Sequence, residues 1–313
     1  MKCGFRFQVD KEVNFVYWLQ SITNWNWYFN SKEYQFYQEL TGEFDNKEKL
    51  ILKKFANFLK PPEIYKIFSN YRKRGYLWLW GRYARIPITS SREKRYWQRV
   101  KSTMLQKFEI LWSEHLPLLR DWQIRLENHD FLSTNKGLTK VEKFFNNFLD
   151  QSIVIQLCVN HQKNFPSGHV KREFPNLILL NLSSVRKSEF DKVISILNHE
   201  LSHLIEYNSP KNELLSHSIS KLIEPKKIQQ QNPSWRHLIS ESIITSIAGR
   251  NFSYLDRKLK LINDFNQNHW NNEIGRQILQ TAYEISKVTE RYLDQGKEMD
   301  QEYIDYVVIT MLS

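Results

Sequence analysis

Residues 190–205 read FDKVISILNHELSHLI, and this stretch decides how the second half of the chain is organised. Its apolar residues recur at spacings of three and four, which predicts an amphipathic helix with one face against a core. That face consists of Phe190, Val193, Ile194, Leu197, Leu201, Leu204 and Ile205. Ser188 and Asp191 stand at the spacing of a capping box, so we expect the helix to begin there.

The same helix contains His199-Glu200-Leu201-Ser202-His203, an H-E-x-x-H sequence. Helical geometry places His199 and His203 one turn apart on one face, where they can share one zinc ion. Glu200 directly follows His199, so its side chain lies on an adjacent side of the helix. From there it can act as a general base on water at the metal. The alternative interpretation is a pair of surface histidines on an amphipathic helix.

The period of the apolar pattern divides the chain near residue 150. Before it, apolar and aromatic residues recur at helical spacing, and we expect a helix from Trp97 to about Pro117 and another from Leu138 to Leu149. After it, residues 153–159 and 177–182 are short apolar runs that predict two strands. The sequence therefore predicts a predominantly helical α+β protein with a helical region at 1–150 and a region with a small sheet at 151–313.

A catalytic zinc site needs a third protein ligand. Position 209 is Ser209, which excludes the metzincin pattern with its third histidine. Glu241 is the only charged residue between Leu238 and Gly249 on an almost wholly apolar helix, so we expect a cation beside it. Zinc is one such cation, and a salt bridge to Arg236 or Arg250 is the alternative. The weaker ligand candidates are Glu213, Glu224, His217 and His237.

Over about residues 150–250 the chain resembles the gluzincin group of zinc metallopeptidases, which combine H-E-x-x-H with a glutamate on a later helix. The resemblance implies a zincin-like catalytic region, with His199, His203 and Glu241 as zinc ligands and Glu200 as general base. It also implies that Leu177–Leu182 is the edge strand that pairs with an extended peptide substrate.

The resemblance leaves two roles without a residue. Several gluzincin families have an acid that orients the first histidine at the position where this chain has Thr245, so that role is unassigned. The group that stabilises the oxyanion of the tetrahedral intermediate is also open. Tyr254, His269 and Tyr283 are candidates, and nothing in the sequence chooses among them.

Basic residues are concentrated in the first half. The net charge is +11, of which residues 1–150 contribute +10. Residues 66–107 carry twelve Lys and Arg with one acid, Glu93, and interleave them with eight aromatic residues. This mixture is typical of surfaces that bind nucleic acid or another polyanion. It is also typical of helices whose aromatics form a core covered by Arg and Lys stems, and docking of an acidic protein is a third interpretation.

Composition excludes several other classes of protein. Cys3 and Cys158 are the only cysteines, too few for a disulfide framework or a four-cysteine metal site, and they favour a reducing, cytoplasmic setting. The sequence contains no apolar run of 18 residues and no signal-peptide pattern at Met1–Asp10, so we expect neither secretion nor a membrane span.

The sequence thus supports two hypotheses. The first is a cytoplasmic zinc-dependent peptidase that acts on a peptide or protein substrate, with an acidic partner favoured over nucleic acid. The second is a nucleic-acid or polyanion-binding protein that uses residues 66–107 and has a structural or inactive zinc site.

Overall fold

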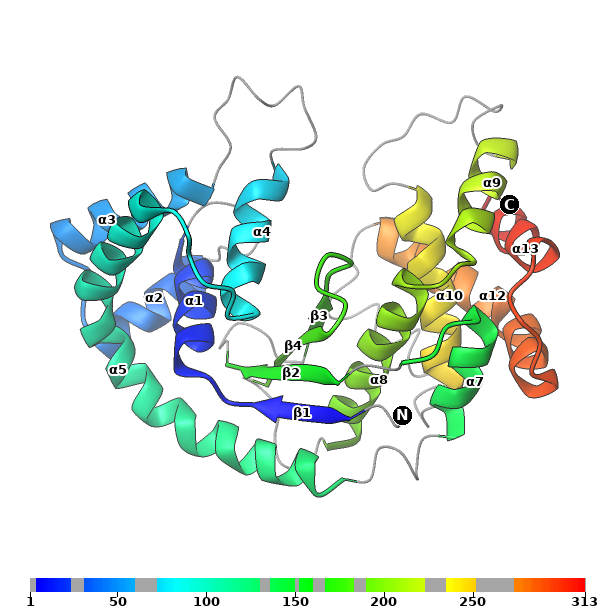
Figure 1. Cartoon of the computed structure of the whole chain (residues 1–313), viewed down its shortest axis with the longest axis horizontal. Coiled ribbons are helices and arrows are strands. Elements are labelled where there is room, and N and C mark those ends of the chain that lie inside the picture. Colours follow the sequence, from blue (N-terminus) through cyan, green and yellow to red (C-terminus); the bar gives the residue numbers. More distant parts are fainter. Residues whose placement is uncertain are drawn as a thin grey trace.

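The computed structural model describes residues 4–23, 31–59, 72–129, 136–149, 152–159, 167–182, 190–222, 235–251 and 273–312. These residues form mostly helices and one four-stranded sheet, so the α+β expectation is confirmed (Figure 1). The helices are α1 (Lys11–Ile22), α2 (Ser31–Thr41), α3 (Asn46–Leu59), α4 (Arg72–Tyr83), α5 (Ser91–Glu127), α7 (Lys136–Phe145), α8 (Phe190–Tyr207), α9 (Asn212–Leu222), α10 (Trp235–Asn251), α12 (Glu273–Gln295) and α13 (Gln301–Leu312).

The sheet has the strand order β1-β2-β4-β3. Its strands are β1 (Phe5–Gln8), β2 (Ile153–Cys158), β3 (Ser167–Val170) and β4 (Leu177–Asn181). The two strands expected from the apolar runs are present as β2 and β4, and they pair in parallel. The sequence did not predict β1, which pairs in parallel with β2, or β3, which pairs antiparallel with β4.

The expectation that Leu177–Leu182 is the edge strand is wrong. β4 is hydrogen-bonded on both sides, to β2 and to β3. The segment between the two apolar runs contains β3, which turns back and pairs with the far side of β4. Within the described part of the chain, the outer strand at that end of the sheet is therefore β3.

The two faces of the sheet pack against two different helical layers (Figure 1). Because side chains alternate along a strand, Ile153, Ile155 and Leu157 face one core, which includes residues of α7, α8 and α10. Val154 and Cys158 face the other core, formed mainly by the helices that precede β2. Both faces are apolar, which explains why β2 and β4 read as continuous hydrophobic runs.

Helix α5 contributes to both cores, and its length differs from the prediction. It runs for 37 residues through Pro117. Met104 and Phe108 lie in the core of the N-terminal helices, whereas Leu119 and Trp122 lie in the core beneath α8. Proline has no N–H group, so one carbonyl in the preceding turn of the helix lacks its hydrogen-bond donor. Because Pro117 is exposed, this carbonyl lies on the solvent side, where water can replace the missing donor.

Helix α7 ends four residues earlier than expected, at Phe145, because Asn146 has a φ of 49° and turns the chain out of the helix. Ser209 Oγ donates to the Phe145 carbonyl at 2.5 Å, and Asn147 Nδ2 donates to the Ile205 carbonyl at 2.8 Å. These contacts fix α7 against the end of α8.

The described cores do not separate at residue 150. α7 and the second half of α5 pack with the later helices, and β1 joins a sheet whose other strands follow residue 150. The division into 1–150 and 151–313 therefore stays a prediction about the sequence pattern. Among the described helices, none is long and apolar enough to cross a membrane.

Candidate metal centre

The H-E-x-x-H sequence lies in the middle of α8, as expected. Val193, Leu197, Leu201 and Leu204 are fully buried and anchor one face of this helix in the core. The expected capping residue Ser188 lies outside the described residues. Helix α8 packs beside both β3 and α10, so its histidines lie between an outer strand and a second helix.

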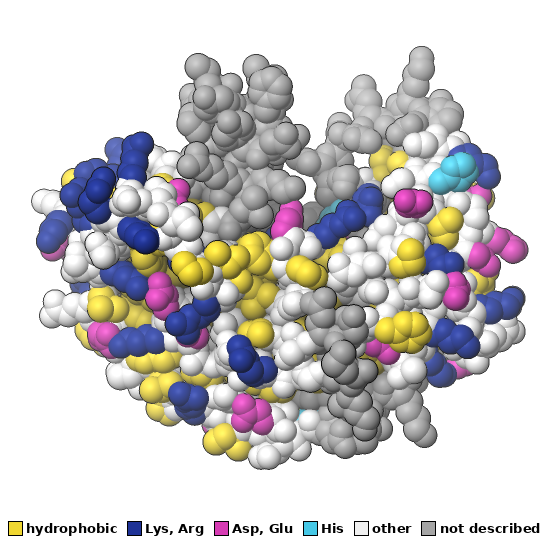
Figure 2. Space-filling model, viewed as in Figure 1, with side chains coloured by type: hydrophobic (Ala, Val, Ile, Leu, Met, Phe, Trp, Pro, Cys, Tyr) yellow, Lys and Arg dark blue, Asp and Glu magenta, His cyan; other side chains and the backbone are white. Residues whose placement is uncertain are grey.

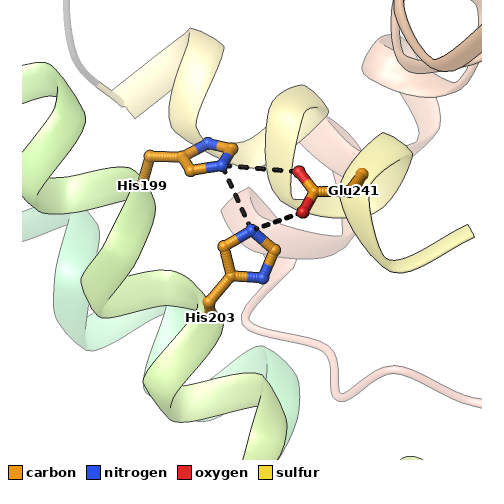
Figure 3. A group of neighbouring side chains, drawn as sticks. All are labelled: His199, His203 and Glu241. Atoms are coloured by element: carbon orange, nitrogen blue, oxygen red, sulfur yellow. Dashed lines mark hydrogen bonds and ion pairs between the residues drawn. The ribbon is translucent and has the colours of Figure 1, made fainter. Parts of the chain in front are cut away.

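His199, His203 and Glu241 converge on one point, with Glu241 supplied by α10 (Figure 3). His203 Nε2 lies 3.1 Å from His199 Nε2 and 3.3 Å from Glu241 Oε1, and His199 Nε2 lies 3.6 Å from Glu241 Oε2. The side chain of His203 is only 4% exposed, whereas that of His199 is 28% exposed. The cluster is therefore anchored in the core and open on one side.

Carboxylates dominate the electrostatics of this cluster. Burial alone would lower the pKa of His203, but Glu241, Glu206 and Glu200 outweigh burial and raise it well above its usual value. Burial would raise the pKa of Glu241, and the two histidines instead hold it well below its usual range. The site therefore stabilises positive charge between its imidazole and carboxylate groups.

Glu200 lies on the side of α8 that faces β3. Burial is the main reason that its pKa is raised, and Glu241 adds to the effect while His199, His203 and Lys171 oppose it. Its side chain packs directly on the backbone of Gly168 in β3. Glu200 is thus a buried carboxyl group next to the outer strand, adjacent in sequence to one candidate ligand.

The two arginines weighed as partners for Glu241 do not take that role in the described structure. Arg236 donates to Asn212 Oδ1 at 2.9 Å and to Ser216 Oγ at 3.5 Å, and the side chain of Arg250 is not described. The cationic partners of Glu241 among the described ion pairs are histidines, and a third one, His237, has its Nδ1 3.7 Å from Glu241 Oε1.

Of the weaker ligand candidates, His237 lies beside Glu241, and the other three lie elsewhere or are not described. Glu213 and His217 are exposed on α9, and Glu224 lies outside the described residues. Of the candidates for oxyanion stabilisation, Tyr254 and His269 also lie outside them, and Tyr283 is 54% exposed on α12. The cluster described here is thus formed by the three residues that the sequence favoured as ligands.

The donor set fits a zinc ion in its chemistry. Two imidazole nitrogens and one carboxylate oxygen lie within 4.8 Å of one another, and these are the ligand types of catalytic zinc sites that keep an open position. No protein-family model, curated protein or solved structure matches the chain. The resemblance to gluzincins therefore stays a prediction from the sequence motif.

The sequence did not single out Glu206, which the structure places beside the cluster. Its Oε2 lies 3.9 Å from His203 Nδ1 and accepts a hydrogen bond from Ser240 Oγ at 2.9 Å. Its position three residues after His203 could have indicated a shared helix face. What the sequence could not show is that α10 covers this carboxylate.

The basic segment has clear structural roles where it is described. Trp80, Tyr83 and Trp97 are buried in the core of the N-terminal helices. Lys107 Nζ donates to the carbonyls of the last residue of α2 and of the two residues after it, at 3.0 to 3.1 Å, and Arg85 pairs with Asp10. Lys66, Phe68 and Tyr71 lie outside the described residues, as do the side chains of residues 72–77.

Part of the positive charge remains on the surface. Arg92, Lys94, Arg95 and Arg99 are exposed at the start of α5. Figure 2 shows Lys and Arg side chains gathered over α3 and the first part of α5. The aromatic residues of this segment that are described therefore serve the core, whereas a subset of its cations faces solvent.

Proposed function

We propose that this protein is a zinc-dependent peptidase with a gluzincin-like catalytic region. The observation that carries the proposal is the convergence of His199, His203 and Glu241 from two helices, with Glu200 buried beside them against the outer strand. Two histidines, one carboxylate and a neighbouring second carboxylate make up the set of groups needed for metal-assisted hydrolysis.

Each residue has a distinct task in this proposal. His199 Nε2, His203 Nε2 and Glu241 hold the metal. A zinc ion held there would supply Lewis-acid chemistry, which polarises the carbonyl of the scissile bond and lowers the pKa of water. Glu200 accepts a proton from the attacking water and passes it to the leaving amine nitrogen. Burial raises the pKa of Glu200 above its ordinary value, which favours uptake of a proton by a group that must later return it.

The substrate would be an extended peptide or a flexible protein segment. β3 is the outer described strand at this end of the sheet, and Gly168 in it contacts Glu200. A peptide added beside β3 by main-chain hydrogen bonds would run past the proposed metal site. The exposed cations of α5 favour an acidic partner, and a chain with only two cysteines suits a cytoplasmic setting.

The test measures metal and turnover separately. Purified wild-type protein should contain stoichiometric zinc, which His199→Ala should remove. Glu200→Gln should keep the zinc and lower chelator-sensitive cleavage of a peptide library about 100 to 10,000-fold, as loss of a general base does. Glu213→Gln, which changes an exposed carboxylate on α9, is the matched control and should retain activity. Absence of zinc from the wild type, or full activity of Glu200→Gln, would contradict the proposal.

A further inference from the structure

The two ring nitrogens of His203 face different surroundings. Nε2 faces the candidate metal site, 3.3 Å from Glu241 Oε1. Nδ1 is buried and has no hydrogen-bond partner among the described residues, and a carboxylate oxygen of Glu206 lies 3.9 Å away from it. A buried nitrogen without a partner is costly, so this short gap indicates a contact that closes when the ring turns slightly.

Glu206 is itself in an unusual position for an acid. Its side chain is 4% exposed, and its described ion pair is with His203. Glu residues are rarely buried unless a cation or several hydrogen-bond donors accompany them. The burial of this carboxylate at the end of α8 therefore needs partners, and among the described ion pairs its ionisable partner is His203, through Nδ1.

Glu206 also connects the two helices that supply the candidate ligands. Its Oε2 accepts a hydrogen bond from Ser240 Oγ at 2.9 Å, and Ser240 precedes Glu241 on α10. Asn212 Nδ2 donates to the backbone carbonyl of Glu206 at 2.8 Å, which fixes this last turn of α8 from a third side. The carboxylate thus lies between the ring of one ligand and the residue next to another.

We propose that Glu206 is a positioning residue for the metal site, an inference that rests on the proposed zinc-dependent function. Glu206 accepts the Nδ1–H of His203, which leaves the Nε2 lone pair directed at the metal. Through Ser240 it also sets the position of α10, and with it that of Glu241. Glu206 thus orients the second histidine, His203. The acid that orients the first histidine in several gluzincin families has no counterpart here, because the chain has Thr245 at that position.

The substitution Glu206→Gln tests this role because it keeps the shape of the side chain and removes its charge. The same oxygen of Glu206, Oε2, faces both Ser240 Oγ and His203 Nδ1, so the amide of Gln can take two orientations there. With its oxygen in that place it accepts from both groups, but without the negative charge that strengthens the bond to Nδ1–H. With its NH₂ group in that place it can only donate, which favours the tautomer with the proton on Nε2, and that atom then cannot bind a metal. The variant should therefore fold as wild type does and bind zinc less well.

The experiment measures zinc affinity by competition with a chelator and records the visible absorption of the Co²⁺-substituted protein. We expect Glu206→Gln to weaken zinc binding by about 10 to 100-fold and to change the Co²⁺ spectrum, as loss of a partner behind a ligating histidine does. Glu142→Gln is the matched control, because Glu142 is a partly buried carboxylate on α7 that accepts from Leu149 N at 3.0 Å. Its zinc affinity and spectrum should equal those of the wild type.

Ser240→Ala provides a second, smaller perturbation. It removes the contact to α10 and leaves Glu206 beside His203, so it should weaken zinc less than Glu206→Gln does. If Glu206→Gln fails to fold, Ser240→Ala decides the question. Wild-type zinc affinity and an unchanged Co²⁺ spectrum in the folded variants would overturn the role of Glu206 while leaving the zinc site intact. Failure of the wild type to bind zinc would instead overturn the proposed function.

Discussion

Gly168 in β3 lies so close to Glu200 in α8 that a side chain at residue 168 would collide with the carboxylate. A Cβ atom built on Gly168 would come within 2.7 Å of both Cδ and Oε1 of Glu200. Carbon atoms in proteins do not approach at that distance, so a larger residue must displace Glu200. Because residue 168 is a glycine, the outer strand leaves room for the carboxylate of the proposed general base at this position.

Gly168→Ala should therefore separate metal binding from turnover. The added methyl group pushes the Glu200 carboxylate out of position. We therefore expect peptide hydrolysis to fall by an amount that approaches the loss in Glu200→Gln, which is roughly 100-fold or more. Zinc content should remain stoichiometric, because the three proposed ligands do not contact residue 168 in the described set of interactions.

Gly81→Ala is the control for this variant. Gly81 lies in α4, and a Cβ atom there would meet nothing within 4 Å. Alanine is also the better helix former, so stability should stay equal or rise slightly. Full activity in Gly168→Ala would show that Glu200 can work from a different position and would remove the strand from the mechanism.

Glu241→Ala should abolish both zinc retention and hydrolysis. Two histidines alone form an incomplete site, and the carboxylate is the group that α10 contributes. Helix content measured by circular dichroism should stay close to wild type, since only one side chain that is 16% exposed is lost. Glu213→Ala and Glu224→Ala should change neither zinc content nor activity. Stoichiometric zinc in Glu241→Ala would assign the third ligand to another residue.

Acid should weaken the contact between α9 and α13 through Asp305. Burial would raise the pKa of this carboxyl group, but hydrogen bonds from Ser218, Lys221 and Gln301 outweigh burial and lower it. Because the pKa is lower in the folded state, the carboxylate stabilises the fold fully at pH values above its pKa in the unfolded chain, about 3.9. This stabilisation is lost as the pH falls through the pKa of the folded state.

Asp305→Asn should consequently reduce the free energy of unfolding by about 1 to 2 kcal/mol at pH 7, with a difference that shrinks as the pH falls below about 4. Urea unfolding at several pH values measures this. Glu109→Gln serves as the control, because Glu109 pairs with Lys11 at a site where both side chains are 44% exposed, and such pairs contribute little. A pH-independent difference for Asp305→Asn would rule out the charge as its cause.

We expect that the exposed basic residues at the start of α5 are hydrated and do not bind nucleic acid. Trp80, Tyr83 and Trp97 are buried, and Trp78 and Tyr96 are partly buried against the same core, so these aromatics offer bases little surface for stacking. We therefore expect no duplex DNA binding near about 150 mM salt. Fluorescence anisotropy with labelled duplex DNA across a salt series checks this. A linear fall of log affinity with log salt, at a slope near 0.9 per contact and reduced by Arg95→Glu with Arg99→Glu, would contradict it and favour the polyanion-binding hypothesis.

The sequence predicted the elements whose pattern is local and long. The helical stripe of α8, the apolar runs of β2 and β4, and the isolated acid Glu241 on apolar α10 are all visible within a short window. Burial on both sides of β2 and β4 makes their runs continuous, which is why they stand out from the helical pattern around them.

The missed elements depend on partners that are distant in sequence. β1 has only four residues, alternates Phe with Arg6 and Gln8, and is a strand because β2 pairs with it. β3 reads Ser-Gly-His-Val, which contains no apolar run. The importance of Glu206 likewise depends on Ser240 in another helix, and helix α5 continues through Pro117 because that residue faces solvent.

The pairing of β1 with β2 has a consequence for the order of events during synthesis. Gln8 is in register with Gln156, so β1 has no pairing partner until synthesis has reached residue 156. The helices α1 to α5 are made in that interval, before the sheet that they cover exists. Pairing between such distant segments slows folding, and the apolar side chains of α1 to α5 that pack on the sheet stay exposed until β2 and β4 have been made.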